Sequence, residues 1–231
     1  KNNHIESYKS ALACDPISAF GGVVCCNFKI SKVLAIELNK LFFEIIIANG
    51  FESSALKILK VKKNLRLIDA SNYILKDTTK FFSSNEEILF QSEDLLKFSN
   101  KNFTFVSKKK PNQKQMKNLL FAFNVCRNVK SNAIVLAANE TTIGIGSGQP
   151  SRLDSCQIAI DKMMRFNNTS DDIVAASDAF FPFIDGIEKL VQSGVTAVIQ
   201  PSGSIRDKEI INFANQTNTI LVFSKTRHFK H

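Results

Sequence analysis

The chain has 231 residues and a mass of 25.8 kDa, of which 44% are hydrophobic and 22% charged, with a formal net charge of +9. These proportions exclude a disordered tail, and the length suits one large or two small domains with a real core. The most apolar stretch, residues 41–48, is short and contains Glu44, so no membrane-spanning helix and no membrane partner are expected.

The positive charge comes mainly from lysines spread along the chain, with one tight run at residues 108–110. Basic residues do not alternate with aromatic ones in the way that stacks nucleic-acid bases. We therefore interpret the charge as a solvated surface that helps to attract anions, and we expect no nucleic-acid partner. A basic nucleic-acid-binding domain is the alternative that net charge alone would allow.

Cysteine and histidine usage favours neither a disulfide framework nor a metal site. The five cysteines form no CxxC pair, and their odd number indicates reduced thiols in a cytoplasmic protein. The three histidines, His4, His228 and His231, lie at the two ends without metal-ligand spacing.

Hydrophobic periodicity in the first half predicts alternating short helices and strands. The residue before Pro16 is pushed out of the α region and ends the first helix, and Ser31 can cap the second. The predicted helices cover residues 4–13, 31–42 and 54–59, and the predicted strands cover residues 23–26, 44–48 and 65–68. Residues 70–112 are interpreted as a connecting region that holds a boundary between subdomains 1–90 and 91–231.

The second half alternates more regularly. Capping boxes begin at Ser151 and Ser204, and Gly194 ends a helix. The predicted helices cover residues 113–128, 151–166, 185–192 and 204–215, and the predicted strands cover residues 133–137, 142–145, 173–176, 195–199 and 219–223. This order predicts an α/β fold with a mostly parallel sheet covered by helices.

Ligands of such folds bind where strands end and helices begin. The first such junction, residues 144–152, combines glycine-rich backbone with Arg152 at a helix start, which favours a phosphate or carboxylate. The spacing matches neither a Rossmann nor a Walker motif. The glycines could equally serve bulges and tight turns.

Two further junctions also stand out. Residues 201–205 could bind a polar group through backbone amides, or form an ordinary capped turn. Residues 176–185 place three phenylalanines beside two aspartates, which suits a flat heterocycle with amino groups. Core packing of the phenylalanines and helix capping by Asp185 would explain the same residues. The basic, aromatic end, residues 226–231, could be inert or could add an arginine and a histidine to a site.

Taken together, six segments resemble one family nearly from end to end. They are residues 15–22, 131–134, 143–152, 177–183, 199–207 and 227–231. They resemble the bifunctional purine biosynthesis proteins, and within them the AICAR transformylase domain. The resemblance implies cytidine deaminase-like α/β/α layers in two subdomains with mixed, mostly parallel sheets. It also implies a homodimer with shared sites, and no metal.

The resemblance implies formyl transfer from 10-formyltetrahydrofolate to the 5-amino group of AICAR in IMP biosynthesis, by proteins that are also IMP cyclohydrolases. The residues that fall where the family binds the ribotide are Gly21, Glu44, Asn132, Arg152, Phe180 and Arg227. Those that fall where it binds the folate are Leu153, Asp185, Ser204 and Ile205. Two of the matching residues, Asn132 and His231, lie near the reacting groups in the family.

One departure concerns the general base. The family uses an adjacent Lys-His pair, which is expected shortly before Lys1; His4 follows Asn3 and does not match it. The cyclohydrolase domain is likewise expected outside this sequence. We therefore expect this chain alone to be inactive. The alternative is a non-catalytic, ligand-binding relative, which the upstream coding sequence would distinguish.

Overall fold

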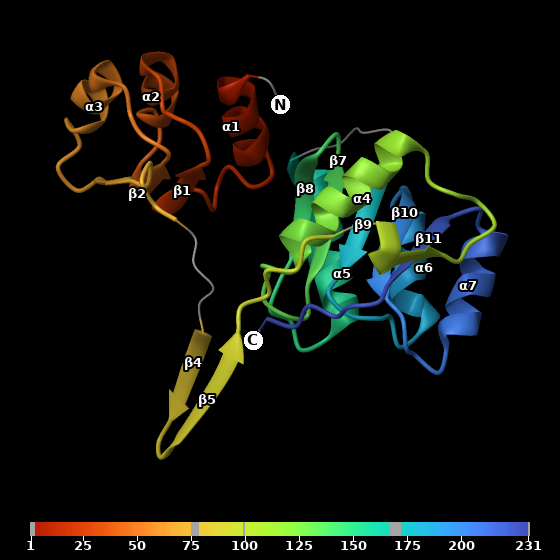
Figure 1. Cartoon of the computed structure of the whole chain (residues 1–231). Helices are drawn as coiled ribbons and strands as arrows, with labels where there is room; N and C mark the ends of the chain where they lie inside the picture. Colours follow the sequence, from red (N-terminus) through yellow and green to blue (C-terminus); the bar gives the residue numbers. More distant parts are fainter. Residues whose placement is uncertain (1–2, 75–78, 99, 167–171, 231) are drawn as a thin grey trace. The chain divides into compact units, whose positions relative to one another are not determined.

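The computed structural model describes residues 3–74, 79–98, 100–166 and 172–230 (Figure 1). The chain divides into two compact units. The N-terminal unit comprises Lys1–Leu12 and Pro16–Leu96, and the C-terminal unit comprises Ala13–Asp15 and Lys97–His231. Both units mix helices with strands, and the sheets contain parallel and antiparallel pairs, which confirms the predicted α/β class.

The N-terminal unit packs three helices with a parallel sheet of order β1-β2-β3. Its helices are α1 (His4–Ala13), α2 (Lys32–Leu38) and α3 (Ser53–Leu59), and its sheet strands are β1 (Gly22–Cys26), β2 (Phe43–Ala48) and β3 (Arg66–Asp69). The core joins buried side chains of α2, α3 and β2, among them Leu34, Leu59 and Ile46.

Helix α2 ends at Leu38, earlier than the predicted residue 42. The Lys62 ammonium donates hydrogen bonds to the carbonyls of Asn39 at 2.6 Å and Leu41 at 2.9 Å. These carbonyls are therefore satisfied without another helical turn. The chain can then enter β2 at Phe43.

The region interpreted as a connection contains an antiparallel hairpin of β4 (Thr79–Ser84) and β5 (Glu87–Ser92). Asn85 in its turn has a φ of 49°, in the left-handed region that asparagine tolerates. All residues of both strands are exposed.

The C-terminal unit is built on a six-stranded sheet of order β6-β11-β10-β9-β7-β8. Its strands are β6 (Phe103–Phe105), β7 (Ile134–Ala138), β8 (Thr141–Gly146), β9 (Ile173–Ser177), β10 (Val195–Pro201) and β11 (Ile220–Ser224). Strand β10 is parallel to β9 and β11, whereas the pairs β7-β8, β7-β9 and β6-β11 are antiparallel. The N-terminal sheet is thus parallel, whereas this sheet is mixed. The β7-β8 pair is antiparallel because a two-residue turn joins the two strands without a crossover.

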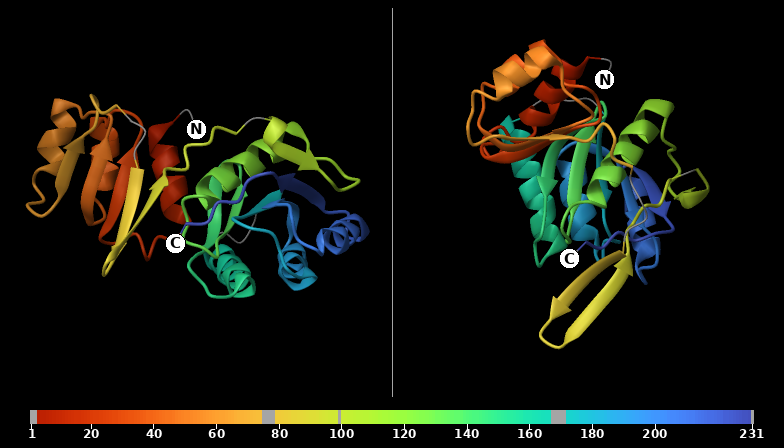
Figure 2. Two further views of the ribbon diagram at one scale, coloured as in Figure 1. Left: turned by 60° about the horizontal axis from the view of Figure 1, so that its bottom comes forward. Right: turned by 60° about the vertical axis from the view of Figure 1, so that its left-hand side comes forward.

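Helices cover both faces of this sheet, giving three layers. The helices are α4 (Gln113–Cys126), α5 (Arg152–Phe166), α6 (Ile184–Gln192) and α7 (Asp207–Gln216), with a short 3-10 helix at Asn100–Asn102. Helix α4 lies on one face, and α5, α6 and α7 lie on the other (Figure 2, left). Two separate cores follow, one under α4 and one under the other three helices. Strands β7 and β9 are buried on both faces, as their continuous apolar sequences require.

The two predicted capping boxes behave differently. Ser151 precedes α5, and its Oγ accepts the Asp154 N–H at 3.4 Å. The second prediction is wrong in position, because α7 begins at Asp207 and not after Ser204. There the Asp207 carboxylate accepts the backbone N–H groups of Gly203 at 2.8 Å and Ser204 at 3.2 Å, which holds residues 203–206 in a turn before the helix.

Candidate functional site

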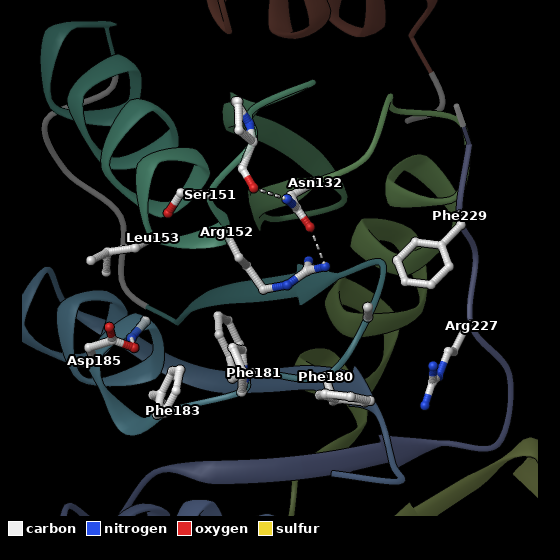
Figure 3. A pocket seen from close by; sticks show the side chains of 14 residues that line it. Asn132, Ser151, Arg152, Leu153, Phe180, Phe181, Phe183, Asp185, Arg227 and Phe229 are labelled. Atoms are coloured by element: carbon white, nitrogen blue, oxygen red, sulfur yellow. Dashed lines mark hydrogen bonds between the residues drawn. The ribbon is translucent and has the colours of Figure 1, made fainter.

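A pocket of about 490 Å³ opens in the C-terminal unit (Figure 3). The loops after β8, β9 and β11 supply most of its wall. Its lining residues are Asn132, Pro150, Ser151, Arg152, Leu153, Ala179, Phe180, Phe181, Pro182, Phe183, Asp185, Gly186, Arg227 and Phe229. In the view of Figure 3, Leu153, Phe183 and Asp185 gather at one end, and Phe180, Arg227 and Phe229 at the other. The pocket thus has a carboxylate end and a cationic end.

The glycine-rich strand β8 positions the helix that carries Arg152. A Cβ on Gly144 would lie 2.1 Å from the Ala159 carbonyl oxygen, and one on Gly146 would lie 1.9 Å from that of Ser155. Both glycines therefore allow α5 to pack directly on the strand. Gly148, with a φ of 68°, makes the turn before the helix. The predicted role in bulges and tight turns therefore holds for Gly148, whereas Gly144 and Gly146 serve close packing of the helix, and Arg152 lines the pocket besides.

Arg152 lies at the centre of a buried polar network. Its Nη1 donates to the Ser177 hydroxyl at 2.8 Å and to the Asp178 carboxylate, and its Nη2 donates to Asn132 Oδ1 at 2.7 Å. The Arg152 side chain is 9% exposed, and the Asp178 side chain is fully buried. Arg152 is therefore an internally paired cation, with Nε–H and one Nη2–H left for other partners.

Asn132 is held as firmly as Arg152. Its Nδ2 donates to the carbonyls of Gln149 at 2.9 Å and Pro150 at 3.0 Å, and its backbone N–H also donates to Gln149, at 3.2 Å. Both amide hydrogens are thus engaged. The Oδ1 atom accepts one bond from Arg152 and has a second lone pair available. Asn132 thus bridges the Pro150 carbonyl and Arg152, and Figure 3 shows its bond to Arg152 as a dashed line.

The phenylalanines of the loop after β9 have different roles. Phe181 is 1% exposed, and a Cβ on Gly186 would lie 2.6 Å from its ring, so this phenylalanine belongs to the core. Phe183 is 50% exposed, and the Arg206 guanidinium carbon lies 4.6 Å from the centre of its ring. Core packing therefore explains Phe181 but leaves Phe180 and Phe183 as walls of the pocket.

Arg227 provides the exposed cation of the site. Its guanidinium carbon lies 4.6 Å from the centre of the Phe180 ring, a cation–π distance. Within the described residues, no carboxylate lies within ion-pair distance of Arg227. A Cβ on Gly203 would lie 3.4 Å from its Nη2, so the turn after β10 approaches this side chain closely. Unlike Arg152, Arg227 is therefore not neutralised by any carboxylate in the part of the chain that the structure describes.

Asp185 is the carboxylate of the pocket. It is the second residue of α6, and the residue at the N-cap position is Phe183. The alternative that made Asp185 the N-cap is therefore wrong. Its Oδ1 accepts the Gly186 N–H at 2.7 Å, and the side chain is exposed. The remaining acceptor positions can serve a ligand with amino groups.

The structure brings together six of the residues predicted for a site. They are Asn132, Arg152, Leu153, Phe180, Asp185 and Arg227, all in the wall of one pocket. Ser204 and Ile205 lie outside this wall, in the turn beside Gly203, where the Ile205 side chain is fully exposed.

Three other predicted residues lie elsewhere. Gly21 and Glu44 belong to the N-terminal unit, where Gly21 has a φ of 72° and the Glu44 carboxylate accepts a bond from Arg66 at 3.0 Å. His231 lies outside the described residues. The roles of all these residues stay predictions.

The sequence analysis counted Asp178 among the two aspartates of residues 176–185, but it did not predict the pairing of Asp178 with Arg152 or the contacts of Ser131 and Ser177 with the same network. A signal was present, because a serine and an aspartate directly follow a buried strand in Ser177-Asp178. The sequence analysis also assigned no role to Phe229, which is 48% exposed and lines the pocket.

The cysteines near the site are not arranged as nucleophiles. Burial raises the pKa of the Cys156 thiol to about 12. Burial, and then the negative charge of Asp178, raise the pKa of the Cys126 thiol well above its ordinary value. Both thiols are therefore protonated at neutral pH. Over the ranges that the structure describes, no three His, Cys, Asp or Glu side chains cluster as metal ligands, and no helix is long and apolar enough to cross a membrane.

Comparisons with known proteins agree on one family. A sequence model of the AICARFT/IMPCHase bienzyme family matches residues 1–162. Three similar proteins, each called bifunctional purine biosynthesis protein PurH, come from Buchnera aphidicola (44% identical), Caldicellulosiruptor saccharolyticus (42%) and Aquifex aeolicus (42%). The alignments cover 98–100% of this chain and 44% of each relative, so the chain spans less than half of their length.

One solved structure, titled "Structural genomics, protein ybgI, unknown function", matches with 11% identity over 88% of this chain and 72% of that chain. Its TM-score of 0.19 is too low to carry an argument about the fold.

Proposed function

The chain belongs to the AICARFT/IMPCHase bienzyme family, and from this premise we propose that it forms part of a site for formyl transfer from 10-formyltetrahydrofolate to the 5-amino group of AICAR. The observation that carries the proposal is the pocket with opposite ends. Arg227, which has no carboxylate partner among the described residues, lies at one end and the exposed Asp185 carboxylate at the other, with phenylalanine rings and the paired Arg152 between them. The two substrates differ in the same way, since one carries a phosphate and the other a pterin with amino groups.

We place the ribotide at the cationic end. Arg227 is exposed and has no carboxylate partner among the described residues, so its charge is available to a phosphate dianion. Arg152 is already neutralised by Asp178, and its two remaining N–H groups suit a neutral acceptor such as the carboxamide oxygen. This division follows from the ion pair, because the carboxylate of Asp178 would repel a phosphate placed beside Arg152.

We place the folate at the carboxylate end. The Asp185 carboxylate can accept two parallel hydrogen bonds from the amide-like edge of a pterin. Leu153 and Phe183 supply apolar walls beside it, and Arg206 stacks on the Phe183 ring at 4.6 Å. Ser204 and Ile205 lie in the following turn, which we propose as a contact for the rest of the folate.

The chemistry requires a base for the amine and donors for the formyl oxygen as it becomes anionic. The amine of AICAR is conjugated with the ring and is a weak nucleophile. Within the described residues, the lining of the pocket includes no lysine or histidine, and Asp185 is its one carboxylate. We assign the base to no residue of this chain. Asn132, whose Oδ1 has a free lone pair, can orient the amine, and the pocket would hold both substrates at contact distance.

A binding and activity experiment tests the proposal. AICAR and a non-reactive folate analogue are titrated separately and together into the full-length protein that carries this chain, by calorimetry, and formyl transfer is then assayed. We expect both ligands to bind and the reaction to proceed. Binding of both ligands without turnover would favour the non-catalytic relative, and binding of neither would contradict the proposal.

We also propose that the protein is a homodimer and that a second copy covers the β4-β5 hairpin. Phe81 pairs with Phe90 on one face and Phe82 with Leu89 on the other, and these side chains are 49–68% exposed. An uncovered two-stranded hairpin is at best marginally stable in water. Sedimentation of the wild type as a dimer, and of a Phe81→Ser/Phe90→Ser variant as a folded monomer, would support this proposal. A monomeric wild type would contradict it.

A further inference from the structure

Asp178 connects three parts of the pocket wall. Its Oδ1 accepts a hydrogen bond from Arg152. Its Oδ2 accepts one from the hydroxyl of Ser131, the residue before Asn132, at 2.5 Å. Its backbone carbonyl accepts a hydrogen bond from the N–H of His228 at 3.1 Å, and His228 stands between the pocket residues Arg227 and Phe229 in the sequence. Asp178 does not line the pocket itself.

Hydrogen bonds hold both the backbone and the side chain of Asp178 in place. The residue is fully buried, and its own N–H donates to the carbonyl of Ala133, the residue just before β7, at 3.3 Å. Ser177, also fully buried, donates its hydroxyl to the Ala179 carbonyl at 2.7 Å while it accepts from Arg152. A buried carboxylate needs such partners, since an unpaired charge there would be strongly unfavourable.

We propose that Asp178 is a positioning residue that fixes the Arg152 guanidinium, and through it the Asn132 carboxamide, in the orientation that the ribotide requires. The inference rests on the proposed function for its substrate. The Asp178 side chain acts on Arg152 and Ser131, whereas its backbone acts on the segment with Arg227. A change confined to the side chain therefore separates the two effects.

The test compares Asp178→Asn with wild type in the full-length protein. Asparagine is isosteric and keeps the backbone bond to His228, but it has lost the charge, and one of its terminal atoms is a donor. We expect the specificity constant for AICAR to fall about tenfold or more, while the KM for the folate stays within about twofold. Asp161→Asn is the control. This exposed carboxylate on α5 accepts a surface bond from Gln157 and does not line the pocket, so the substitution should leave both values unchanged.

A double-mutant cycle shows whether the effect passes through Arg152. In an Arg152→Gln background, Asp178→Asn should change AICAR kinetics by less than about twofold. Equal losses with and without Arg152 would overturn the inference, as would a folded Asp178→Asn enzyme with wild-type AICAR kinetics. If Asp178→Asn fails to fold, Ser131→Ala is tested instead, because it removes the hydrogen bond from the Ser131 hydroxyl to the Asp178 carboxylate. It should then lower the AICAR specificity constant severalfold, and an unchanged value would overturn the inference.

Nuclear magnetic resonance supplies a readout that needs no turnover. The Arg152 side-chain N–H signals should be resolved and slowly exchanging in the wild type and averaged in Asp178→Asn. Averaged signals in the wild type would overturn the positioning role whatever the activity. A wild type with fixed Arg152 signals but without ligand binding would instead contradict the proposed function.

Discussion

Arg227 lies with its guanidinium carbon 4.6 Å from the centre of the Phe180 ring, in the wall of the pocket and without a carboxylate partner among the described residues. An arginine on an aromatic face keeps its hydrogen-bond donors in the ring plane available for a ligand. This relationship leaves the donors of Arg227 available in the pocket wall.

Arg227→Ala should weaken AICAR binding by about 2–3 kcal/mol, since a charge-assisted bond to phosphate is lost. Arg227→Lys should recover part of this loss, because lysine keeps the charge but not the planar fork. Calorimetric titration measures both. Lys225→Ala, a change of an exposed basic residue two positions earlier, is the control, and a similar loss there would point to general electrostatic attraction instead.

Arg152→Ala should damage both folding and binding. It leaves the buried Asp178 carboxylate without its cation, and breaking a buried pair from one side costs about 3–5 kcal/mol. Urea denaturation measures this change in the free energy of unfolding. Arg206→Ala removes an exposed arginine whose ion pair with Glu209 spans 3.6 Å, and it should cost less than about 1 kcal/mol. Equal stability of Arg152→Ala and wild type would contradict the role of this pair.

Asp185→Asn should raise the KM for the folate severalfold while the melting temperature stays nearly constant. Asparagine has one acceptor oxygen where the carboxylate has two, so the paired bonds to a pterin cannot form. Stability should be preserved, because Asp185 is not the N-cap of α6. Steady-state kinetics of the full-length protein check this prediction. An unaltered KM for the folate in the folded variant would show that Asp185 does not bind the folate.

Gly146→Ala should destabilise the C-terminal unit by several kcal/mol or prevent its folding, because the new methyl group would lie 1.9 Å from a backbone oxygen of α5. Gly148→Ala is the matched comparison, since its Cβ would lie 3.8 Å from the nearest atom and only the left-handed φ of 68° opposes it. That cost is about 1–2 kcal/mol. Thermal denaturation of both variants should rank them in this order, and the reverse order would contradict the packing argument.

The free energy of unfolding should decrease at alkaline pH, partly because thiols whose pKa is raised by burial lose their protons on unfolding. Burial raises the pKa of Cys156 to about 12 and that of Cys26 to about 11, from an ordinary value of 9.0. The folded state therefore binds more protons than the unfolded state above pH 9, so the stability present below that pH decreases as pH rises. Urea titrations at about pH 7.5 and about pH 9.5 should show a smaller decrease for Cys156→Ala than for wild type. An identical decrease would contradict the contribution of Cys156.

Most elements of the fold could be predicted from the sequence, because their signals are local. Apolar runs such as residues 133–137 and 173–176 indicate buried strands, and Ser31 and Ser151 mark helix starts at the right positions. Helix ends were less accurate where a distant side chain intervened, as Lys62 does at the end of α2. The hairpin after residue 78 was not predicted, because its strands lack a one-sided apolar alternation.

The sequence by itself determined which residue types are available to the site, since the glycine-rich turn, the phenylalanine loop and the terminal arginine are continuous motifs. Only the tertiary structure decided how they act. It paired Arg152 with Asp178 across 26 positions and left Arg227 exposed beside Phe180, across 47 positions. The two arginines look alike in the sequence. Burial separates them, because a buried cation must be neutralised within the protein, whereas an exposed one remains available to a ligand.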